Sequence, residues 1–218
     1  MSDTPKIEVS RRGFLKGAGL TAATTVLDTA TALAHDAQEA AKGDTAVGPD
    51  AVPIKLHVNG QEHAVSVEPR YTLAETLREH LNLTGTKVVC DRGSCSACTV
   101  WVDGAPQLAC MTLAVDAVGH KITTIEGLSH GEQLHPVQAA FIKHDALQCG
   151  FCTPGMVMSC AALLQRNPHP TLADVKHAVS GNLCRCGTYP KIFAATLDVA
   201  QSGNKVANLL ELNTAEEG

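Results

Sequence analysis

Nine cysteines are the feature that most constrains what this chain of 218 residues can fold into. Eight of them form two groups of four with short spacings, and the ninth, Cys160, stands apart from both groups. Eight cysteines can build a disulfide framework, or they can bind metal ions or clusters. The spacing within each group is the evidence that separates these two possibilities.

The first group has the spacing Cys-x4-Cys-x2-Cys, and a fourth cysteine follows after eleven residues. Its members are Cys90, Cys95, Cys98 and Cys110. This is the plant-type ferredoxin spacing for a [2Fe–2S] cluster, in which four thiolates converge on two irons. The small residues from Gly93 to Ala97 suit a tight loop whose backbone N–H groups point at sulfur. A hairpin return strand is expected to supply Cys110.

Two structural alternatives to a cluster exist for the first group. A zinc site more often shows two Cys-x2-Cys pairs, and this half of the chain has only Cys95 and Cys98 at that spacing. Neighbouring loop cysteines rarely meet the geometry of disulfides among themselves. The spacing therefore favours the cluster.

The second group consists of Cys149-x2-Cys152 and Cys184-x-Cys186, and its spacing alone is only moderately specific. The segments around it, Cys149–Gly155 and Leu183–Gly187, add the runs Cys-Gly-Phe-Cys-Thr-Pro-Gly and Leu-Cys-Arg-Cys-Gly. Over residues 53–200 the chain resembles the two-cluster iron–sulfur subunits of the xanthine oxidase family of molybdenum hydroxylases. It looks closest to those of periplasmic aldehyde oxidoreductases, and a Cys-Arg-Cys-Gly-Thr-Tyr-Pro run also resembles isoquinoline 1-oxidoreductase small subunits.

The resemblance implies an electron-transfer subunit without catalytic residues of its own. A large partner subunit would hold molybdenum and its pterin dinucleotide, expected to be the cytosine form, and would oxidise an aldehyde or an N-heterocycle. The cluster of the second group would receive electrons first, with Gln148 and Cys186 contacting the pterin. The first group would pass them to a flavin (FAD) subunit or to a cytochrome.

Two positions depart from the family pattern, which usually has glycine next to a cysteine at both. They are Val89 and Ser96. Because glycine permits backbone angles that other residues resist, these substitutions bear on the loop geometry and on the N–H···S contacts that tune a cluster's potential. Cys160 lies on an apolar helical stripe and is expected to be a small buried hydrophobe. None of the ten histidines stands at a cluster-ligand spacing.

Residues 53–127 are predicted to form a small β-grasp domain. Apolar residues alternate on either side of Asn59-Gly60, which is a strong hairpin signal. Thr72 and Glu75 form a capping-box pattern ahead of a short amphipathic helix. A second hairpin should span Thr99 to Leu108, and a last strand is expected at Ile122–Ile125.

Residues 134–202 change to a helical period with four short amphipathic stripes, typical of a bundle. A Thr171…Asp174 pattern starts the third helix and Pro190 opens the fourth. The fold class is therefore α+β: an N-terminal β-grasp, ferredoxin-like [2Fe–2S] domain, followed by an all-α, four-helix [2Fe–2S]-binding domain.

The N-terminus has the pattern of an export signal. Ser10-Arg11-Arg12-Gly13-Phe14-Leu15-Lys16 precedes a weakly apolar run that ends at Ala32-Leu33-Ala34. Residues 1–34 are interpreted as a twin-arginine signal peptide, 35–52 as a linker and 203–218 as a C-terminal tail. Export in the folded state to the periplasm would suit a protein loaded with cofactor. No membrane span is expected in the mature chain, and a net charge of −5 without a basic stripe argues against nucleic-acid binding.

Two other functions remain open on the sequence alone. A free-standing periplasmic [2Fe–2S] carrier would explain the first cysteine group but not the second. A periplasmic binding protein stabilised by disulfides or zinc would be colourless.

Overall fold

The computed structural model describes residues 48–202. The signal peptide predicted at residues 1–34, residues 35–47 of the linker and the tail at 203–218 lie outside the described residues. The first strand begins at Val52, one residue before the predicted start of the folded body. No described helix is long and apolar enough to cross a membrane.

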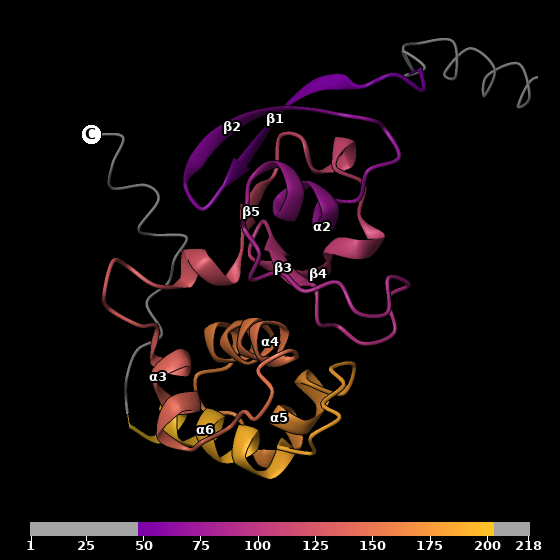
Figure 1. The fold of residues 1–218 in the computed structure, drawn as a ribbon. Helices are drawn as coiled ribbons and strands as arrows, with labels where there is room; N and C mark the ends of the chain where they lie inside the picture. The colour runs from indigo at the N-terminus through magenta and orange to yellow at the C-terminus, as the bar shows by residue number, and fades with distance from the viewer. Residues whose placement is uncertain (1–47, 203–218) are drawn as a thin grey trace, which may run out of the picture. The chain divides into compact units, whose positions relative to one another are not determined.

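A five-stranded mixed sheet forms the first half of the described chain (Figure 1). Its strands lie in the order β2-β1-β5-β3-β4. Their bounds are β1 (Val52–Val58), β2 (Gln61–Val67), β3 (Thr99–Val102), β4 (Ala105–Leu108) and β5 (Lys121–Thr123). The central β5 pairs in parallel with β1 and antiparallel with β3, which joins the two hairpins into one sheet. This arrangement confirms the predicted ferredoxin-like fold.

Local turn and cap chemistry explain why these elements begin and end where they do. Asn59 and Gly60 have φ angles of 52° and 79°, the left-handed geometry that the β1–β2 hairpin turn requires. The predicted capping box is present, because the Thr72 hydroxyl accepts from the Glu75 N–H and the Glu75 carboxylate accepts from the Thr72 N–H. It starts α2 (Leu73–Glu75), which continues as a wider π-helical turn over Thr76–His80.

Two predicted strand positions were wrong. Ile125 is not in the last strand: β5 ends at Thr123, and Ile125 begins a 3-10 turn that runs to Leu128. Cys110 is not in the return strand either, since β4 ends at Leu108 and Cys110 lies in the 3-10 turn that follows, Ala109–Met111. The ladder between β4 and β3 ends at the Thr99–Leu108 pair, and β1, one neighbour of β5, ends at the Val58–Ile122 pair.

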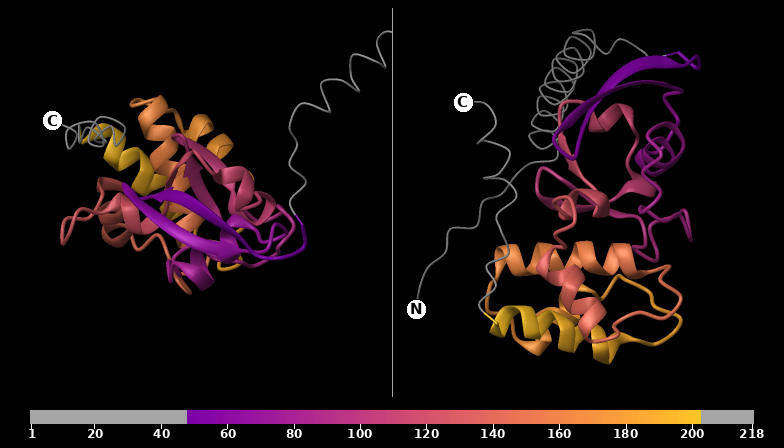
Figure 2. Two further views of the ribbon diagram at one scale, coloured as in Figure 1. Left: turned by 90° about the horizontal axis from the view of Figure 1, so that it is seen from above. Right: turned by 60° about the vertical axis from the view of Figure 1, so that its left-hand side comes forward.

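Four helices form the second half, as predicted (Figure 2). They are α3 (Pro136–Lys143), α4 (Thr153–Arg166), α5 (Leu172–Ala178) and α6 (Tyr189–Gln201). A capping box of Thr171 and Asp174 starts α5, and a proline in the first turn opens α6. Helix α4 is buried from Gly155 to Leu164 because it packs on β3 and β4 on one side and on α3 and α5 on the other.

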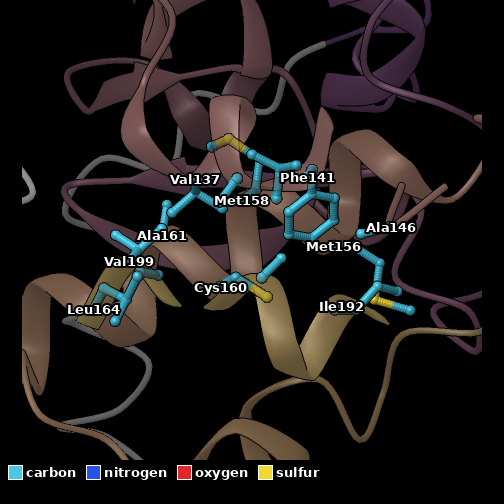
Figure 3. Close-up of a cluster of buried hydrophobic side chains, with 14 of the residues drawn as sticks. Val137, Phe141, Ala146, Met156, Met158, Cys160, Ala161, Leu164, Ile192 and Val199 are labelled. Carbon is cyan, nitrogen blue, oxygen red and sulfur yellow. The ribbon is translucent and has the colours of Figure 1, made fainter. Parts of the chain in front are cut away.

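Two apolar cores result, one in each half. The sheet core contains Leu56, Leu73, Leu77 and Ile122, together with Cys98 and Cys110 of the first cysteine group. The helical core is shown in Figure 3 and is centred on α4. The β3 residue Trp101 belongs to this helical core, so the sheet contributes its largest side chain to the packing of the helices. Cys160 is fully buried there beside Ala161, as expected of an apolar cysteine.

Candidate iron–sulfur sites

The first cysteine group is assembled by the β3–β4 hairpin and by the loop that precedes it. Cys98 stands immediately before β3, and Cys110 follows β4 by two residues. The hairpin register pairs Thr99 with Leu108, so the chain just outside this pair brings Cys98 and Cys110 together. The Ala109 N–H donates to the Cys98 carbonyl oxygen at an N–O distance of 3.3 Å, which closes the hairpin at this point.

The loop from Cys90 to Cys98 contains three residues in the left-handed backbone region: Asp91 (φ 51°), Gly93 (φ 72°) and Ser96 (φ 53°). These turns direct backbone N–H groups at sulfur, and the Ser94 N–H donates to Cys90 Sγ at 3.3 Å. Ser96, one of the two departures from the family pattern, therefore occupies a conformation that glycine adopts more readily. Val89, the other departure, is exposed and has no positive φ.

The thiols of the first group experience opposite environments. The Arg92 backbone N–H, assisted by Cys95 and Ser94, lowers the pKa of Cys90 to about 6. Burial raises the pKa of Cys98 to about 12, although the Cys110 backbone N–H opposes this rise. Cys90 thus neighbours Cys95, and Cys98 neighbours Cys110.

The second cysteine group lies at helix ends. Cys149 and Cys152 are in the connection between α3 and α4, where Cys152 is the residue that caps α4. Cys184 and Cys186 are in the connection between α5 and α6. Burial, with the neighbouring Cys184 and Cys149 adding to it, raises the pKa of Cys152 to about 12. Cys184 and Cys152 are therefore neighbours, as Cys90 and Cys95 are in the first group.

Cys184 is held by a network of hydrogen bonds at the start of α6. Its sulfur lies 3.2 Å from the Thr188 hydroxyl, and its N–H donates to the Tyr189 hydroxyl at 2.8 Å. Burial by itself would raise the pKa of Cys184. Hydrogen bonds from the side chain and backbone of Thr188, from Cys152 and from the Gly187 N–H outweigh burial and lower it to about 7.

All nine cysteines are free thiols, and three pairs of cluster candidates are in contact: Cys90 with Cys95, Cys98 with Cys110, and Cys152 with Cys184. Within residues 48–202, no group of three or more His, Cys, Asp or Glu side chains converges on a point where one metal ion could sit. Pairs of thiols with N–H groups directed at sulfur fit a two-iron cluster, in which each iron takes two cysteine ligands.

The segments that carry the two cysteine groups are joined by two hydrogen bonds to backbone carbonyls. The Leu183 N–H donates to the Cys95 carbonyl oxygen at 3.1 Å, and Asn182 Nδ2 donates to the Ser96 carbonyl oxygen at 3.2 Å. At Gly155 of α4, an added Cβ would lie 2.2 Å from the Ser96 carbonyl oxygen, so this close approach requires glycine. The loop of the first group is thereby packed against the segment that carries the second.

The other residues singled out from the sequence differ in how deeply they are buried. Gln148 is exposed, and Cys186 is half-buried with its neighbours Arg185 and Gly187 exposed. His135 is buried as the cap of α3, where its Nδ1 accepts from the Val137 N–H at 3.2 Å. Asn182, Thr188 and Tyr189 support the second group and were missed, because a single sequence gives no signal for a polar side chain that bonds to distant backbone.

Family models match both halves of the chain and the N-terminus. A 2Fe-2S iron-sulfur cluster binding domain matches residues 56–115, and a [2Fe-2S] binding domain matches residues 124–197. A twin-arginine translocation pathway signal sequence matches residues 8–27, which confirms the predicted type of signal.

Two relatives with a named function match most of this chain. The aldehyde oxidoreductase iron-sulfur-binding subunit PaoA of Escherichia coli (strain K12) is 43% identical over 209 residues, which cover 89% of this chain and 89% of the relative. The nicotine 6-hydroxylase small subunit of Paenarthrobacter nicotinovorans is 50% identical over 157 residues, covering 72% of this chain and 94% of that subunit.

Solved structures agree with the sequence comparison. A chain of quinoline 2-oxidoreductase from Pseudomonas putida 86 superposes with a TM-score of 0.69 at 46% identity, covering 71% of this chain and 97% of the other. Aldehyde oxidoreductase from Desulfovibrio gigas gives a TM-score of 0.66 at 39% identity, covering 74% of this chain and 18% of that longer chain. The protein therefore belongs to the iron–sulfur subunits of the xanthine oxidase family of molybdenum hydroxylases, which serve electron transfer in their oxidoreductase complexes.

Proposed function

We propose that the two cysteine groups each hold one [2Fe–2S] cluster and that electrons enter at the second group and leave from the first. The ligands of the first cluster would be Cys90, Cys95, Cys98 and Cys110, and those of the second Cys149, Cys152, Cys184 and Cys186. The contacts of Cys90 with Cys95 and of Cys98 with Cys110 in the first group, and of Cys152 with Cys184 in the second, carry this proposal. When bound, a [2Fe–2S] cluster accepts and returns one electron at a time.

The surroundings of the second group support the binding of a partner subunit there. Cys149 is exposed, and two large apolar side chains flank the group with half or more of their surface exposed, Phe151 (51%) and Leu183 (58%). Exposed apolar side chains around a redox site are expected where another subunit covers it. The proposed partner is a large subunit with molybdenum and a pterin dinucleotide, in the cytosine form, which Gln148 and Cys186 would contact.

The surroundings of the first group support a separate site at which electrons leave the protein. Cys95, Cys98 and Cys110 are buried, whereas Cys90 is half-buried and follows the exposed Val89 (56%). Met111 (63% exposed) lies against Gly93 of the same loop. We propose a flavin (FAD) subunit or a cytochrome as the acceptor. The electron would pass to it from the cluster of the first group.

The substrate and the location follow from the relatives and the signal sequence. The Escherichia coli relative is a subunit of an aldehyde oxidoreductase, so an aldehyde is the proposed substrate class of the complex. The relatives that are named for nicotine and nicotinate make an N-heterocycle the second candidate. The twin-arginine signal supports a periplasmic complex that is folded and loaded before export.

Iron and sulfide analysis of the full chain tests the ligand assignment. About four irons and four sulfides per chain are expected, since each cluster contains two of each. Cys98→Ser and Cys152→Ser should each leave about two irons, whereas Cys160→Ala should retain about four, because Cys160 packs in the helical core away from both groups. A wild-type content of two irons, or loss of iron in Cys160→Ala alone, contradicts the assignment.

Co-purification tests the complex. The protein isolated from its own host should carry a large subunit with molybdenum, and mass spectrometry of the released cofactors identifies the pterin and any flavin. A chain that purifies alone, fully iron-loaded, would instead support the free-standing carrier.

A further inference from the structure

The segment from Asn182 to Cys184 is bonded to the loop of the first cysteine group at two successive carbonyls. The Leu183 N–H donates to the Cys95 carbonyl oxygen at 3.1 Å, and Asn182 Nδ2 donates to the Ser96 carbonyl oxygen at 3.2 Å. Leu183 directly precedes Cys184, and Cys95 directly precedes Ser96. One backbone hydrogen bond therefore connects a residue of the first group with the neighbour of a residue of the second.

This bond completes a short connection between two proposed ligands. From Cys184 the connection runs along its own backbone to the Leu183 N–H, across the hydrogen bond to the Cys95 carbonyl, and along Cys95 to its sulfur. Every link except the Leu183–Cys95 hydrogen bond is covalent. The length and alignment of that single bond consequently decide how well the two sites are connected.

Asn182 is placed to fix that bond. Its side chain is bonded at both ends, because Nδ2 donates to the Ser96 carbonyl oxygen and Oδ1 accepts from the Ser159 hydroxyl at 3.0 Å. Its own carbonyl oxygen accepts from the Tyr189 hydroxyl at 3.0 Å, and that hydroxyl accepts in turn from the Cys184 N–H at 2.8 Å. Asn182 is only 4% exposed, so these bonds form in a site protected from water.

The glycines around Asn182 permit this close packing. A Cβ at Gly155 of α4 would collide with the Ser96 carbonyl, and a Cβ at Gly181 would lie 3.1 Å from Ser96 Oγ. Helix α4 also supplies Ser159, which orients the Asn182 amide. The contact is thus built from three sides: the first-group loop, α4 and the start of α6.

We propose that Asn182 is a positioning residue for electron transfer between the two clusters, holding the Leu183 N–H against the Cys95 carbonyl so that electrons cross there. The proposal rests on the ligand assignment made under the proposed function. The step moves one electron from the site of the second group to the site of the first, so the first is reduced as the second is oxidised. No proton is transferred and no covalent bond is broken. The initial electron comes from the molybdenum subunit or from an added low-potential reductant.

Replacing the Leu183 amide by an ester is the most direct test, because it removes the N–H and leaves every side chain in place. The experiment uses the full, iron-loaded chain and delivers less than one electron per chain by a photochemical pulse. Freeze-quenched EPR spectra then follow how fast the electron equilibrates between the two clusters. The same replacement at Asp103, whose N–H donates to the Lys121 carbonyl at 2.8 Å in the turn between β3 and β4, is the matched control. Slower equilibration is expected at position 183 and unchanged equilibration at position 103.

Asn182→Ala tests the positioning role separately. Loss of the Asn182 side chain should speed hydrogen exchange of the Leu183 amide by about fivefold, the equivalent of a net hydrogen bond of about 1 kcal/mol. It should also slow equilibration between the clusters. Asn59→Ala is the control, since Asn59 similarly bridges backbone and side chain at Thr124 but within the first domain. That variant should change neither quantity.

The outcomes separate this proposal from the ligand assignment. A wild-type chain with fewer than about four irons contradicts the ligand assignment itself. Four irons with unchanged equilibration in the Leu183 ester contradict the route. Four irons with slow equilibration in the ester, but wild-type exchange and equilibration in Asn182→Ala, retain the route and overturn the role of Asn182.

Discussion

The indole N–H of Trp101 donates a hydrogen bond to the main-chain oxygen of Met158 at an N–O distance of 3.0 Å. Trp101 lies on β3 of the sheet, and Met158 lies in α4 of the helical half. The indole is 1% exposed and packs in the helical core, so one side chain supplies apolar area and a specific bond across the boundary. This contact and the Asn182 contacts hold the two cysteine groups in one arrangement.

Trp101→Phe should destabilise the protein by about 2 kcal/mol, because it removes the bond to Met158 and part of a buried ring system. Circular dichroism is the suitable measurement, since Trp101 is the single tryptophan of the chain and its loss removes tryptophan fluorescence. Tyr71→Phe is the control: the Tyr71 ring packs edge-on against His80 in the first half and should retain wild-type stability. Equal thermal midpoints for Trp101→Phe and wild type would contradict a structural role for the bond.

Ser96→Gly should stabilise the protein by about 0.5–1 kcal/mol, because Ser96 has a φ of 53°, which glycine adopts without a steric penalty. The visible absorbance of the iron-loaded chain should also bleach more slowly on heating. Val89→Gly should destabilise the protein, since Val89 has no positive φ and glycine there only increases the conformational freedom of the unfolded chain. Equal effects of the two substitutions would show that the loop conformation is not what distinguishes these positions.

Local chemistry decided what could be predicted from the sequence. The Asn59-Gly60 turn and the capping box of Thr72 and Glu75 depend on neighbouring residues, and both form as predicted. The ends of β4 and β5 depend on where their ladders with distant strands stop, so Ile125 and Cys110 were placed in strands wrongly. Cysteine spacing indicated the two groups because their members are supplied by short segments, in which neighbouring cysteines are close in sequence.

The contacts between the two cysteine groups could not be predicted from the sequence. Asn182 and Ser96 are 86 positions apart, and their bond involves a backbone carbonyl, which any residue type provides. The requirement for glycine at position 155 likewise arises only from the approach of a distant loop. Such contacts follow from packing of the two halves and leave no local pattern.

His135 predicts a loss of stability in mild acid. Burial, with a smaller contribution from His130, lowers the pKa of His135 to about 4 from an ordinary value of 6.5. Between these values the unfolded chain binds a proton that the folded chain does not, so stability is full above pH 6.5 and falls as the pH drops toward 4. At pH 4.5 the loss should reach about 2.5 kcal/mol, or roughly 5–10 °C in Tm.

His135→Asn isolates this effect, because asparagine can still cap α3 but does not titrate. The thermal midpoint of wild type should fall more steeply than that of the variant between pH 6.5 and pH 4.5. Other carboxylates and histidines are common to both proteins and cancel in the difference. If the thermal midpoints of wild type and variant fall in parallel with pH, His135 gains a proton in the folded state without a loss of stability.

Phe151 should be an anchor for the large subunit. It lies between Cys149 and Cys152, half of its ring is exposed, and aromatic side chains in such positions dominate binding energy. Phe151→Ala should weaken association with the large subunit by roughly ten- to a hundredfold, while the iron content stays at the wild-type value. Interferometry with the immobilised large subunit measures the affinity. Val118→Ala removes an apolar side chain of comparable exposure (44%) in the first domain and should bind as wild type does. Wild-type affinity for Phe151→Ala would place the molybdenum subunit on another face, and the second cysteine group would then lose its assignment as the entry point for electrons.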